Sequence, residues 1–562
     1  MLELHEARAL FSLWRERFAE AAARLNALDR AIGDGDHGTT MARAFQAAEA
    51  RVQAEEFTDL GALFDAAAAT FAETAGGAIG PLFSALLAQA GTTFADATHV
   101  DLQAVTRAFE QGQDAVQAVG QAEVGEKTLL DALAPAVQTL RAQVERGPRA
   151  AFEAALAAAR RGAAGTAALR AAHGRARFLG ERSRGHEDPG AHSISLLLEA
   201  CHDLIVGVRA APPDEAAKVA HPTTPPPGKL LNDPTEMIRE ELEGLARAHP
   251  HHLRLTEHPG VLARAQPKAR GKVGLAMGHG GGHTPSMAGF IGAGLLDADA
   301  YGSLFTCASG VRIAHAIAAA NRGAGVVLLV SNHTGDVLNA RLALHRAQQL
   351  GIETRMTLLT DDVATAPRAS YHKRRGLGGL LFALKVGGAA AEAGASLDEV
   401  AALIEHVNER TATLSVAVRS GTHPATGEPL MNLSPGNIEI GTGVHGESGV
   451  YSGPHLPADK IAERIVAPLV EDLDTLIEGK KLWAFVNGAG GTSMMELHIV
   501  YRGVVHALQR RGLHVADGIV NSYFTTQETG GFSLSLCALD DETAVWWDAP
   551  AHSAYFCKHE RS

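Results

Sequence analysis

The sequence predicts a multidomain protein in which an all-α helical domain precedes an α/β domain. Three observations support this: residues 1–208 have helical periodicity, residues 209–228 are rich in proline, and residues 229–562 alternate short apolar runs with glycine-rich turns and helices. The chain has 562 residues, enough for several cores at roughly 100 to 200 residues per domain.

The first domain opens with a long amphipathic helix. Its apolar residues recur in steps of three and four, which places them on one helical face: Phe11, Trp14, Phe18, Ala21, Leu25 and Leu28. Alanine-rich patterns such as FDAAAATFAETA and SISLLLEACHDLIVGV continue the helical pattern, and β-branched strand runs are absent.

The composition changes at APPDEAAKVAHPTTPPPGK, where clustered prolines end helical structure and favour an extended spacer. Beyond it, the apolar runs KVGLAM, VVLLV and LWAFV each precede a glycine-rich or polar turn. This alternation is typical of an α/β domain.

Composition excludes several classes of protein. The formal charge of −13 disfavours binding to nucleic acid, and no apolar stretch is long enough to predict a membrane span. The four cysteines are too few and too dispersed for a disulfide framework or a CxxC metal site. The start MLELHEARALFSLW does not resemble a secretion signal, so we expect a cytoplasmic enzyme.

An acidic loop, GDGDHGTTM, follows the first helix. Asp29, Asp34 and Asp36 offer hard carboxylate oxygens that suit Mg²⁺ shared with substrate phosphates, and His37 and Thr40 lie beside them as phosphate donors. The alternative for DGD alone is a turn with Asx caps.

Two further segments of this domain suggest phosphate contacts. Gly76 and Gly77 open a helical run, where free amides favour an anion, although a helix-packing glycine cluster explains them equally well. Arg182 in FLGERSRGHEDPGA is a second candidate to pair with phosphate, and the turn Asp188, Pro189, Gly190 follows it.

In the α/β half, three segments place polar groups near strand ends. Gly280, Gly281 and His283 follow KVGLAM before an expected helix, at a position where open sheets bind ligands. Asp336 follows VVLLV, with a helix N-cap as the alternative role. His445 lies between glycines in GTGVHGESG, although most histidines in a chain are structural.

The motifs LNALDRAIGDGDHGTTM, GGAIGPL, VGEKTLLDALAP and LGERSRGHEDPGA resemble, in order, the nucleotide-binding domain of dihydroxyacetone kinases. The resemblance implies an antiparallel helical barrel that holds ATP through two Mg²⁺ ions. It assigns the metal to Asp29, Asp34 and Asp36, and the nucleotide to His37, Thr40, Gly76, Gly77, Thr128, Arg182, Asp188, Pro189 and Gly190.

The motifs GHGGGHTPSMAGFIG, NHTGDVLN, RRGLGG, EIGTGVHGESG and TGGFSLSL resemble the two-lobed ketose-binding domain of the same family. The resemblance implies that His445 holds a ketose as a covalent hemiaminal, and that Asp336 and His283 act in acid–base catalysis. It places Gly280, Gly281 and Ser331 around the substrate and implies a homodimer.

Several positions depart from the family pattern. Ile79 replaces a serine of the phosphate loop, while Gly281, Thr284, Ser331 and His333 replace Ser, Glu, Lys and Tyr of the ketose domain. We expect these smaller or uncharged pocket residues to admit a ketotetrose such as erythrulose. The domain order is also reversed relative to single-chain family members.

The sequence therefore predicts an ATP-dependent kinase for dihydroxyacetone or a ketotetrose, acting on a small ketose and MgATP without nucleic-acid or membrane partners. Two alternatives remain. One is a non-catalytic ketose sensor, and the other is a phosphotransferase that takes phosphate from a phosphocarrier protein.

Overall fold

The computed structural model describes residues 2–33, 35–210, 225–447, 449–477, 481–538 and 540–559. The chain divides into two compact units, Met1–His221 and Pro222–Ser562. The division falls in the proline-rich stretch where the sequence predicts a spacer; residues 211–224 of that stretch lie outside the described residues.

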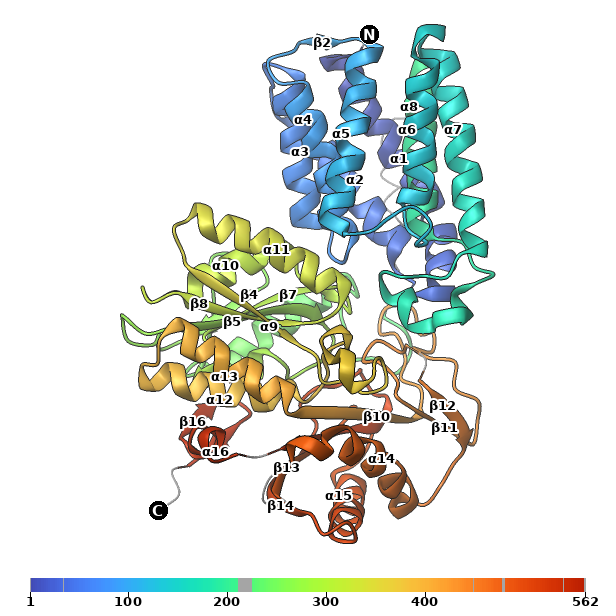
Figure 1. Cartoon of the computed structure of the whole chain (residues 1–562). Helices are drawn as coiled ribbons and strands as arrows, with labels where there is room; N and C mark the ends of the chain where they lie inside the picture. Colours follow the sequence, from blue (N-terminus) through green and yellow to red (C-terminus); the bar gives the residue numbers. More distant parts are fainter. Residues whose placement is uncertain are drawn as a thin grey trace. The chain divides into compact units, whose positions relative to one another are not determined.

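The first unit consists mainly of long helices that run alongside one another (Figure 1). Its α-helices are α1 (Leu4–Ile32), α2 (His37–Ala54), α3 (Leu60–Thr74), α4 (Ile79–Thr93), α5 (Leu102–Gly120), α6 (Leu130–Gln143), α7 (Pro148–Gly165) and α8 (Pro189–Ile205). Each helix contacts the next, and α8 contacts α1. This closure confirms the predicted antiparallel helical barrel.

The ends of α1 follow from local chemistry. Glu3 and Glu6 form a capping box at its start, and the backbone N–H of Gly33 donates to the Asp29 carbonyl at its end. One feature was not predicted: β1 (Leu2–Glu3) pairs antiparallel with β2 (His99–Val100) beside the helices. The short 3₁₀ segments are η1 (Val144–Arg146), η2 (Thr166–Ala168) and η3 (Arg175–Ser183).

Aromatic side chains fill the barrel interior. Phe45 of α2 is fully buried and stacks on Phe18 with ring centroids 4.5 Å apart. The rings of Trp14, Phe71 and Phe83 lie 5.5, 5.2 and 6.4 Å from it. The predicted apolar face of the first helix therefore points into this core.

The second unit contains two six-stranded sheets and one small sheet. The first large sheet has the order β3-β4-β7-β5-β8-β9, and its strands are β3 (Leu253–Leu255), β4 (Val261–Arg264), β5 (Gly274–Gly281), β7 (Ala298–Leu304), β8 (Val326–Ser331) and β9 (Thr354–Leu359). Strands β7, β5, β8 and β9 pair in parallel, whereas β3 and β4 pair antiparallel.

The second large sheet is mostly antiparallel and has the order β12-β11-β10-β15-β13-β14. Its strands are β10 (Thr411–Arg419), β11 (Asn437–Ile440), β12 (Tyr451–Pro454), β13 (Lys481–Gly488), β14 (His514–Asn521) and β15 (Gly530–Ala538). The small sheet joins β6 (Gly292–Ala293), β16 (Ala551–Ser553) and β17 (Cys557–Lys558).

Helices pack against both sheets (Figure 1). They are α9 (Met237–Ala248), α10 (Gly310–Ala320), α11 (Thr334–Gln349), α12 (Leu380–Ala393), α13 (Leu397–Glu409), α14 (Ala458–Leu473), α15 (Met494–Gln509) and α16 (Asp541–Asp548), with η5 (Ala288–Phe290), η6 (Arg368–Lys373) and η7 (Asp474–Leu476). The two sheets with their helices confirm the predicted two-lobed α/β domain.

Apolar strands of the first sheet lie in the middle of this unit. Strand β5 is buried along its whole length, and so are five of the six residues of β8, because helices cover both faces of a parallel sheet. The adjacent parallel strands β5 and β8 therefore deliver the residues that follow them to the same sheet edge.

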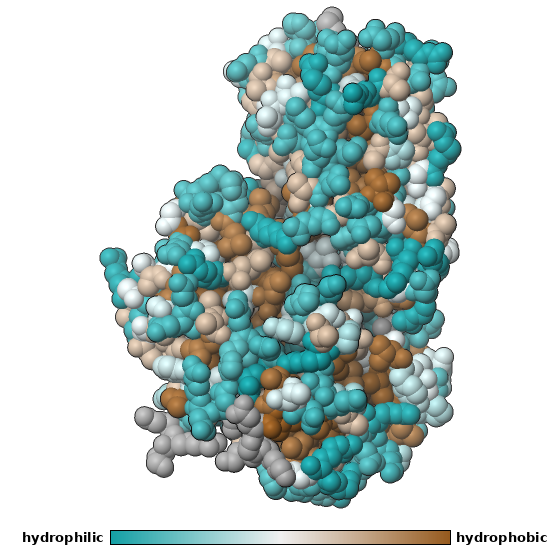
Figure 2. Space-filling view, in the orientation of Figure 1, coloured by the Kyte–Doolittle hydropathy of each residue, from teal (hydrophilic) through white to brown (hydrophobic). Residues whose placement is uncertain are grey.

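Within the described part of the chain, no helix is both long enough and apolar enough to span a bilayer. In the view of Figure 2 the surface of both units is mainly hydrophilic, and the hydrophobic areas are separate patches. Such scattered patches are ordinary for a protein surface in water.

Candidate active site

The first part of the site lies at the carboxyl end of β5. Gly280 and Gly281 are the last residues of this strand, and His283 follows two residues later. The expected helix after these residues is wrong: the chain makes only the 3₁₀ turn η5, after a Thr-Pro-Ser-Met segment. His283 is buried, and its Nδ1–H donates to the Thr525 carbonyl at 2.7 Å.

The second part follows β8 at the same edge. Ser331 ends the strand, and its hydroxyl donates to the Gly376 carbonyl at 3.1 Å. His333 is the N-cap residue of α11, so the N-cap alternative for Asp336 is wrong. Asp336 lies instead in the first turn of α11, where the helix dipole favours a carboxylate.

The third part comes from the second sheet. His445 lies in the turn between β11 and β12, whose Val444 carbonyl accepts a 2.9 Å hydrogen bond from the Thr526 hydroxyl. The Nε2 atoms of His445 and His283 are 3.2 Å apart. The Thr525–Thr526 segment therefore fixes both histidines, although they are 162 residues apart in the sequence.

A buried chain of charges supports His445. Glu447 accepts from the His445 backbone N–H at 2.9 Å and lies 3.3 Å from its Nδ1. Arg375 lies 3.6 Å from the same carboxylate and pairs with Asp362 at 2.5 Å. Burial alone would raise the pKa of Glu447, but His445 and Arg375 outweigh it and hold this pKa well below its usual range.

These contacts limit where protons can be. Only an N–H can bond the Thr525 carbonyl, so the neutral ring of His283 carries its lone pair on Nε2. Burial and the positive charge of His445 lower the pKa of His283 well below its usual value, which favours this neutral form. The short Nε2 to Nε2 distance therefore requires a proton between the rings, or a ligand that replaces it.

Arg375 and Glu447 were not predicted as site residues, and His333 was predicted only as a pocket position that departs from the family pattern. A signal was available for Glu447, which follows His445 by two residues in the same glycine-rich turn. Arg375 lies 72 residues before Glu447, and only the fold brings the two together.

Side chains of α9 lie beside two of the substituted pocket positions, Gly281 and Thr284. A Cβ atom on Gly281 would lie 2.3 Å from the Ile238 Cδ1 atom, so Ile238 of α9 occupies the expected space. The Thr284 hydroxyl donates to partly buried Glu241, also of α9. The expectation of a wider pocket at Gly281 is therefore wrong.

In the helical unit, Asp29 lies in the last turn of α1. One of its carboxylate oxygens accepts backbone N–H bonds from Gly35, Asp36 and His37 at 2.8, 3.1 and 3.4 Å. Asp36 is the N-cap residue of α2. Asp34 lies outside the described residues, so the three-aspartate metal site stays a prediction.

The predicted nucleotide residues near α2 and α8 are largely buried. His37 Nε2 lies 2.7 Å from the Ser193 hydroxyl, and burial lowers the pKa of His37 to about 4. Thr40 lies in the first turn of α2. Asp188 caps α8 by accepting from the Ala191 N–H at 2.7 Å, with Pro189 and Gly190 beginning the helix.

The other four predicted nucleotide residues lie before helices or in a 3₁₀ segment. Gly77 has a positive φ of 67° and precedes α4 together with Gly76, while Ile79 is the first residue of this helix. The Thr128 hydroxyl accepts from the Leu130 N–H at 3.2 Å before α6. Arg182 lies in η3.

The charges of this unit are compatible with a bound cation. Burial, followed by the negative charges of Asp131 and Asp29, raises the pKa of Asp188 to about 7, although Lys127 opposes this effect. A divalent cation near Asp29 and Asp36 would offset the same accumulation of negative charge.

The fold and the site define a two-unit protein that joins a helical domain with an acidic loop to an α/β domain with a buried histidine cluster. A family model described as Dak1 domain matches residues 243–555, and one described as DAK2 domain matches residues 31–203. The chain therefore belongs to the dihydroxyacetone kinase family, with its DAK2 domain first.

Several curated proteins are similar to this chain. L-erythrulose kinase of Pectobacterium atrosepticum is 37% identical over 59% of this chain and 57% of its own length, so the chain spans little more than half of that relative. The dihydroxyacetone-binding subunit DhaK of a PTS-dependent dihydroxyacetone kinase of Listeria innocua is 37% identical over 56% of this chain and 96% of its own length.

Among the solved structures that resemble this chain, two match it over more than half of its length. The dihydroxyacetone kinase of C. freundii has a TM-score of 0.54 at 27% identity and aligns over 59% of this chain and 60% of its own. The dihydroxyacetone kinase operon co-activator Dha-DhaQ also has a TM-score of 0.54, at 28% identity over 57% of this chain and 98% of its own.

Proposed function

We propose that this protein is an ATP-dependent kinase that phosphorylates the terminal hydroxyl of a short-chain ketose held covalently on His445. The observation that carries the proposal is the buried arrangement of His445 between Glu447 and His283, 3.3 and 3.2 Å from its two ring nitrogens. Such a pair of neighbours can activate an imidazole as a nucleophile.

The covalent step follows from this geometry. The proton between the rings moves from His445 Nε2 to His283 Nε2, which leaves a lone pair on His445. His445 Nε2 then attacks the ketose carbonyl carbon, and the carbonyl oxygen takes the proton from His283. The product is a neutral hydroxyl on the ketose and a positively charged imidazole, whose Nδ1–H remains paired with the Glu447 carboxylate.

This step explains selectivity for a carbonyl compound. Glycerol has no carbonyl carbon for His445 to attack, so it would bind only through its hydroxyl groups. We assign Gly280, Gly281 and Ser331 to the pocket wall, because they end the adjacent parallel strands β5 and β8.

Asp336 is the proposed base for phosphoryl transfer. It would accept the proton of the terminal ketose hydroxyl as that oxygen attacks the γ-phosphate. Asp29, Asp34 and Asp36 would hold Mg²⁺, which supplies positive charge to the phosphates when bound. The remaining predicted nucleotide residues, His37, Thr40, Gly76, Gly77, Thr128, Arg182, Asp188, Pro189 and Gly190, would surround the ATP.

ATP is the proposed donor because the chain contains both a DAK2 and a Dak1 domain. The C. freundii dihydroxyacetone kinase was solved in complex with AMP-PNP and Mg²⁺. A phosphocarrier donor is the alternative, since similar proteins of Listeria innocua and Escherichia coli are subunits of PTS- or PEP-dependent kinases. We also propose a cytoplasmic homodimer.

A second candidate function is ketose sensing without phosphoryl transfer. The similarity to the co-activator Dha-DhaQ favours it. The substitution of Ile79 in the predicted phosphate loop also favours it, whereas the retained Asp29 and Asp336 favour the kinase.

The covalent step is tested by mass spectrometry of the intact protein with dihydroxyacetone or erythrulose. We expect one ketose adduct on the wild-type chain and none on His445→Ala. The control is His455→Ala, since His455 is an exposed histidine of the same unit. An adduct of unchanged abundance on His445→Ala would contradict the assignment.

A further inference from the structure

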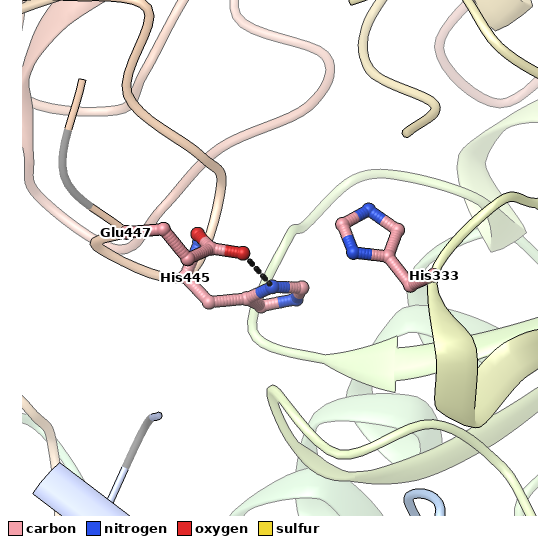
Figure 3. A group of neighbouring side chains, drawn as sticks. All are labelled: His333, His445 and Glu447. Atoms are coloured by element: carbon pink, nitrogen blue, oxygen red, sulfur yellow. Dashed lines mark hydrogen bonds and ion pairs between the residues drawn. The ribbon is translucent and has the colours of Figure 1, made fainter. Parts of the chain in front are cut away.

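A group of potential metal ligands lies in the candidate active site. One ring nitrogen each of His333 and His445 and one carboxylate oxygen of Glu447 lie within 4.8 Å of one another. Within the described ranges this is the one group of three or more His, Cys, Asp or Glu side chains with such geometry. Figure 3 shows that His333 comes from another segment and directs one ring nitrogen toward the other two residues.

The hydrogen bonds around the group prepare its nitrogen atoms for a metal. His333 Nε2 lies 3.3 Å from the Gly376 carbonyl, so its N–H is on Nε2 and its lone pair is on Nδ1. Metal-binding histidines commonly donate their second N–H to a carbonyl in this way. His445 can keep its Nε2–H, which donates to the lone pair of His283, so a metal on its Nδ1 replaces only the proton that faces Glu447.

The spacing of two of these ligands agrees with a tetrahedral metal site. The distance from His445 Nδ1 to Glu447 Oε1 is 3.3 Å. Zinc–nitrogen and zinc–oxygen bonds of about 2.0 to 2.2 Å place neighbouring tetrahedral ligands about 3.3 to 3.5 Å apart. Two histidines and one glutamate with an open fourth position also form a known zinc donor set.

The local charge permits a divalent cation. Arg375 is the nearby cation, 3.6 Å from the Glu447 carboxylate, but its own charge is balanced by Asp362 at 2.5 Å. The remaining carboxylate charge of Glu447 is buried, with only 8% of its side chain exposed. A buried carboxylate grouped with two imidazoles favours Zn²⁺ over the harder Mg²⁺.

We propose that His333, His445 and Glu447 bind one Zn²⁺ ion, and that this ion prevents the ketose from reacting with His445. Zn²⁺ bound to His445 Nδ1 displaces the proton of that atom and leaves the remaining ring proton on His445 Nε2. Nε2 is the atom that must attack the ketose. Metal and covalent ketose therefore exclude each other. This competition rests on the proposed function, whereas the metal site does not.

The site is tested with Co²⁺, whose four-coordinate complexes absorb visible light much more strongly than the hydrated ion. The full chain, without an added histidine tag, is titrated in excess Mg²⁺ to saturate sites for hard cations. We expect one equivalent of strongly absorbing Co²⁺ on the wild type. Loss of a residue that only positions a metal ligand costs roughly 10- to 100-fold in metal affinity. Because His333 is a proposed ligand, His333→Phe should weaken Co²⁺ binding by more than this.

The control addresses a second histidine pair. His252 and His552 have ring centroids 4.7 Å apart and lie outside the site. His552→Phe should leave the Co²⁺ spectrum unchanged. If His333→Phe does not fold, Glu447→Gln serves as the second variant with the same expected loss.

The consequence for the ketose is tested by intact-protein mass spectrometry with dihydroxyacetone. One equivalent of Zn²⁺ should suppress the adduct on the wild type but not on His333→Phe. Absence of the tight Co²⁺ equivalent, or its retention in both variants, would overturn the metal site. A wild type that binds Co²⁺ but forms no adduct without metal would instead contradict the proposed covalent function.

Discussion

Replacing Glu447 by glutamine removes the negative charge beside His445 while keeping the size of the side chain. In the proposed adduct the imidazole ring carries a positive charge, and its Nδ1 lies 3.3 Å from the Glu447 carboxylate. Hydrogen bonds to charged groups contribute about 1.5 to 3 kcal/mol. This corresponds to a roughly 10- to 150-fold loss in the equilibrium constant for adduct formation.

The assay is the adduct fraction as a function of ketose concentration, measured by mass spectrometry of the intact protein. Glu428→Gln is the control, since it neutralises an exposed glutamate of the same unit. Arg375 keeps its partner Asp362 in the variant, so we expect the fold to persist. An adduct equilibrium constant equal to that of the wild type would refute the role assigned to Glu447.

Four further changes test other parts of the account. Phe45→Ala should destabilise the helical unit by about 3 to 5 kcal/mol, because four aromatic rings surround Phe45. Denaturant unfolding measures this loss, and an unchanged unfolding midpoint would contradict it. Gly281→Ser should cost about 1 to 3 kcal/mol through its clash with Ile238, and adding Ile238→Ala should restore part of the loss. Asp34→Asn should abolish Mg²⁺-dependent ADP binding in calorimetry, and unchanged affinity would remove Asp34 from the metal site. The pKa of Asp188 is raised to about 7, so in the absence of Mg²⁺ its contribution to stability is present at low pH and is lost as pH rises from about 4 through 7. Asp188→Asn should therefore flatten the profile of thermal stability against pH over this range. An equally steep profile in the variant would contradict the pKa shift.

The sequence predicted the architecture well because its signals are local. Apolar residues at steps of three and four positions marked the face of α1, and short apolar runs such as VVLLV marked strands of an α/β domain. The pairing of β1 with β2 could not be predicted, since each strand has only two residues and the strands are far apart in the chain, with Leu2 opposite Val100.

The site was only partly predictable for a related reason. Motifs predicted His283, Asp336 and His445 as candidate site residues, but the roles of their neighbours depend on contacts between distant segments. The pairing of Arg375 with Glu447 and the filling of the Gly281 space by Ile238 arise from tertiary packing. The substitution at Gly281 alone therefore predicted a wider pocket, whereas Ile238 fills that space in the folded protein.

In the proposed function, one chain transfers phosphate from ATP to a ketose. The most direct test is the release of ADP from MgATP by the purified full chain with dihydroxyacetone, each erythrulose enantiomer, a ketopentose or glycerol. We expect release that depends on a short ketose, is absent with glycerol, and is lost in His445→Ala. No release with any ketose from folded protein, or equal release with glycerol, would contradict it.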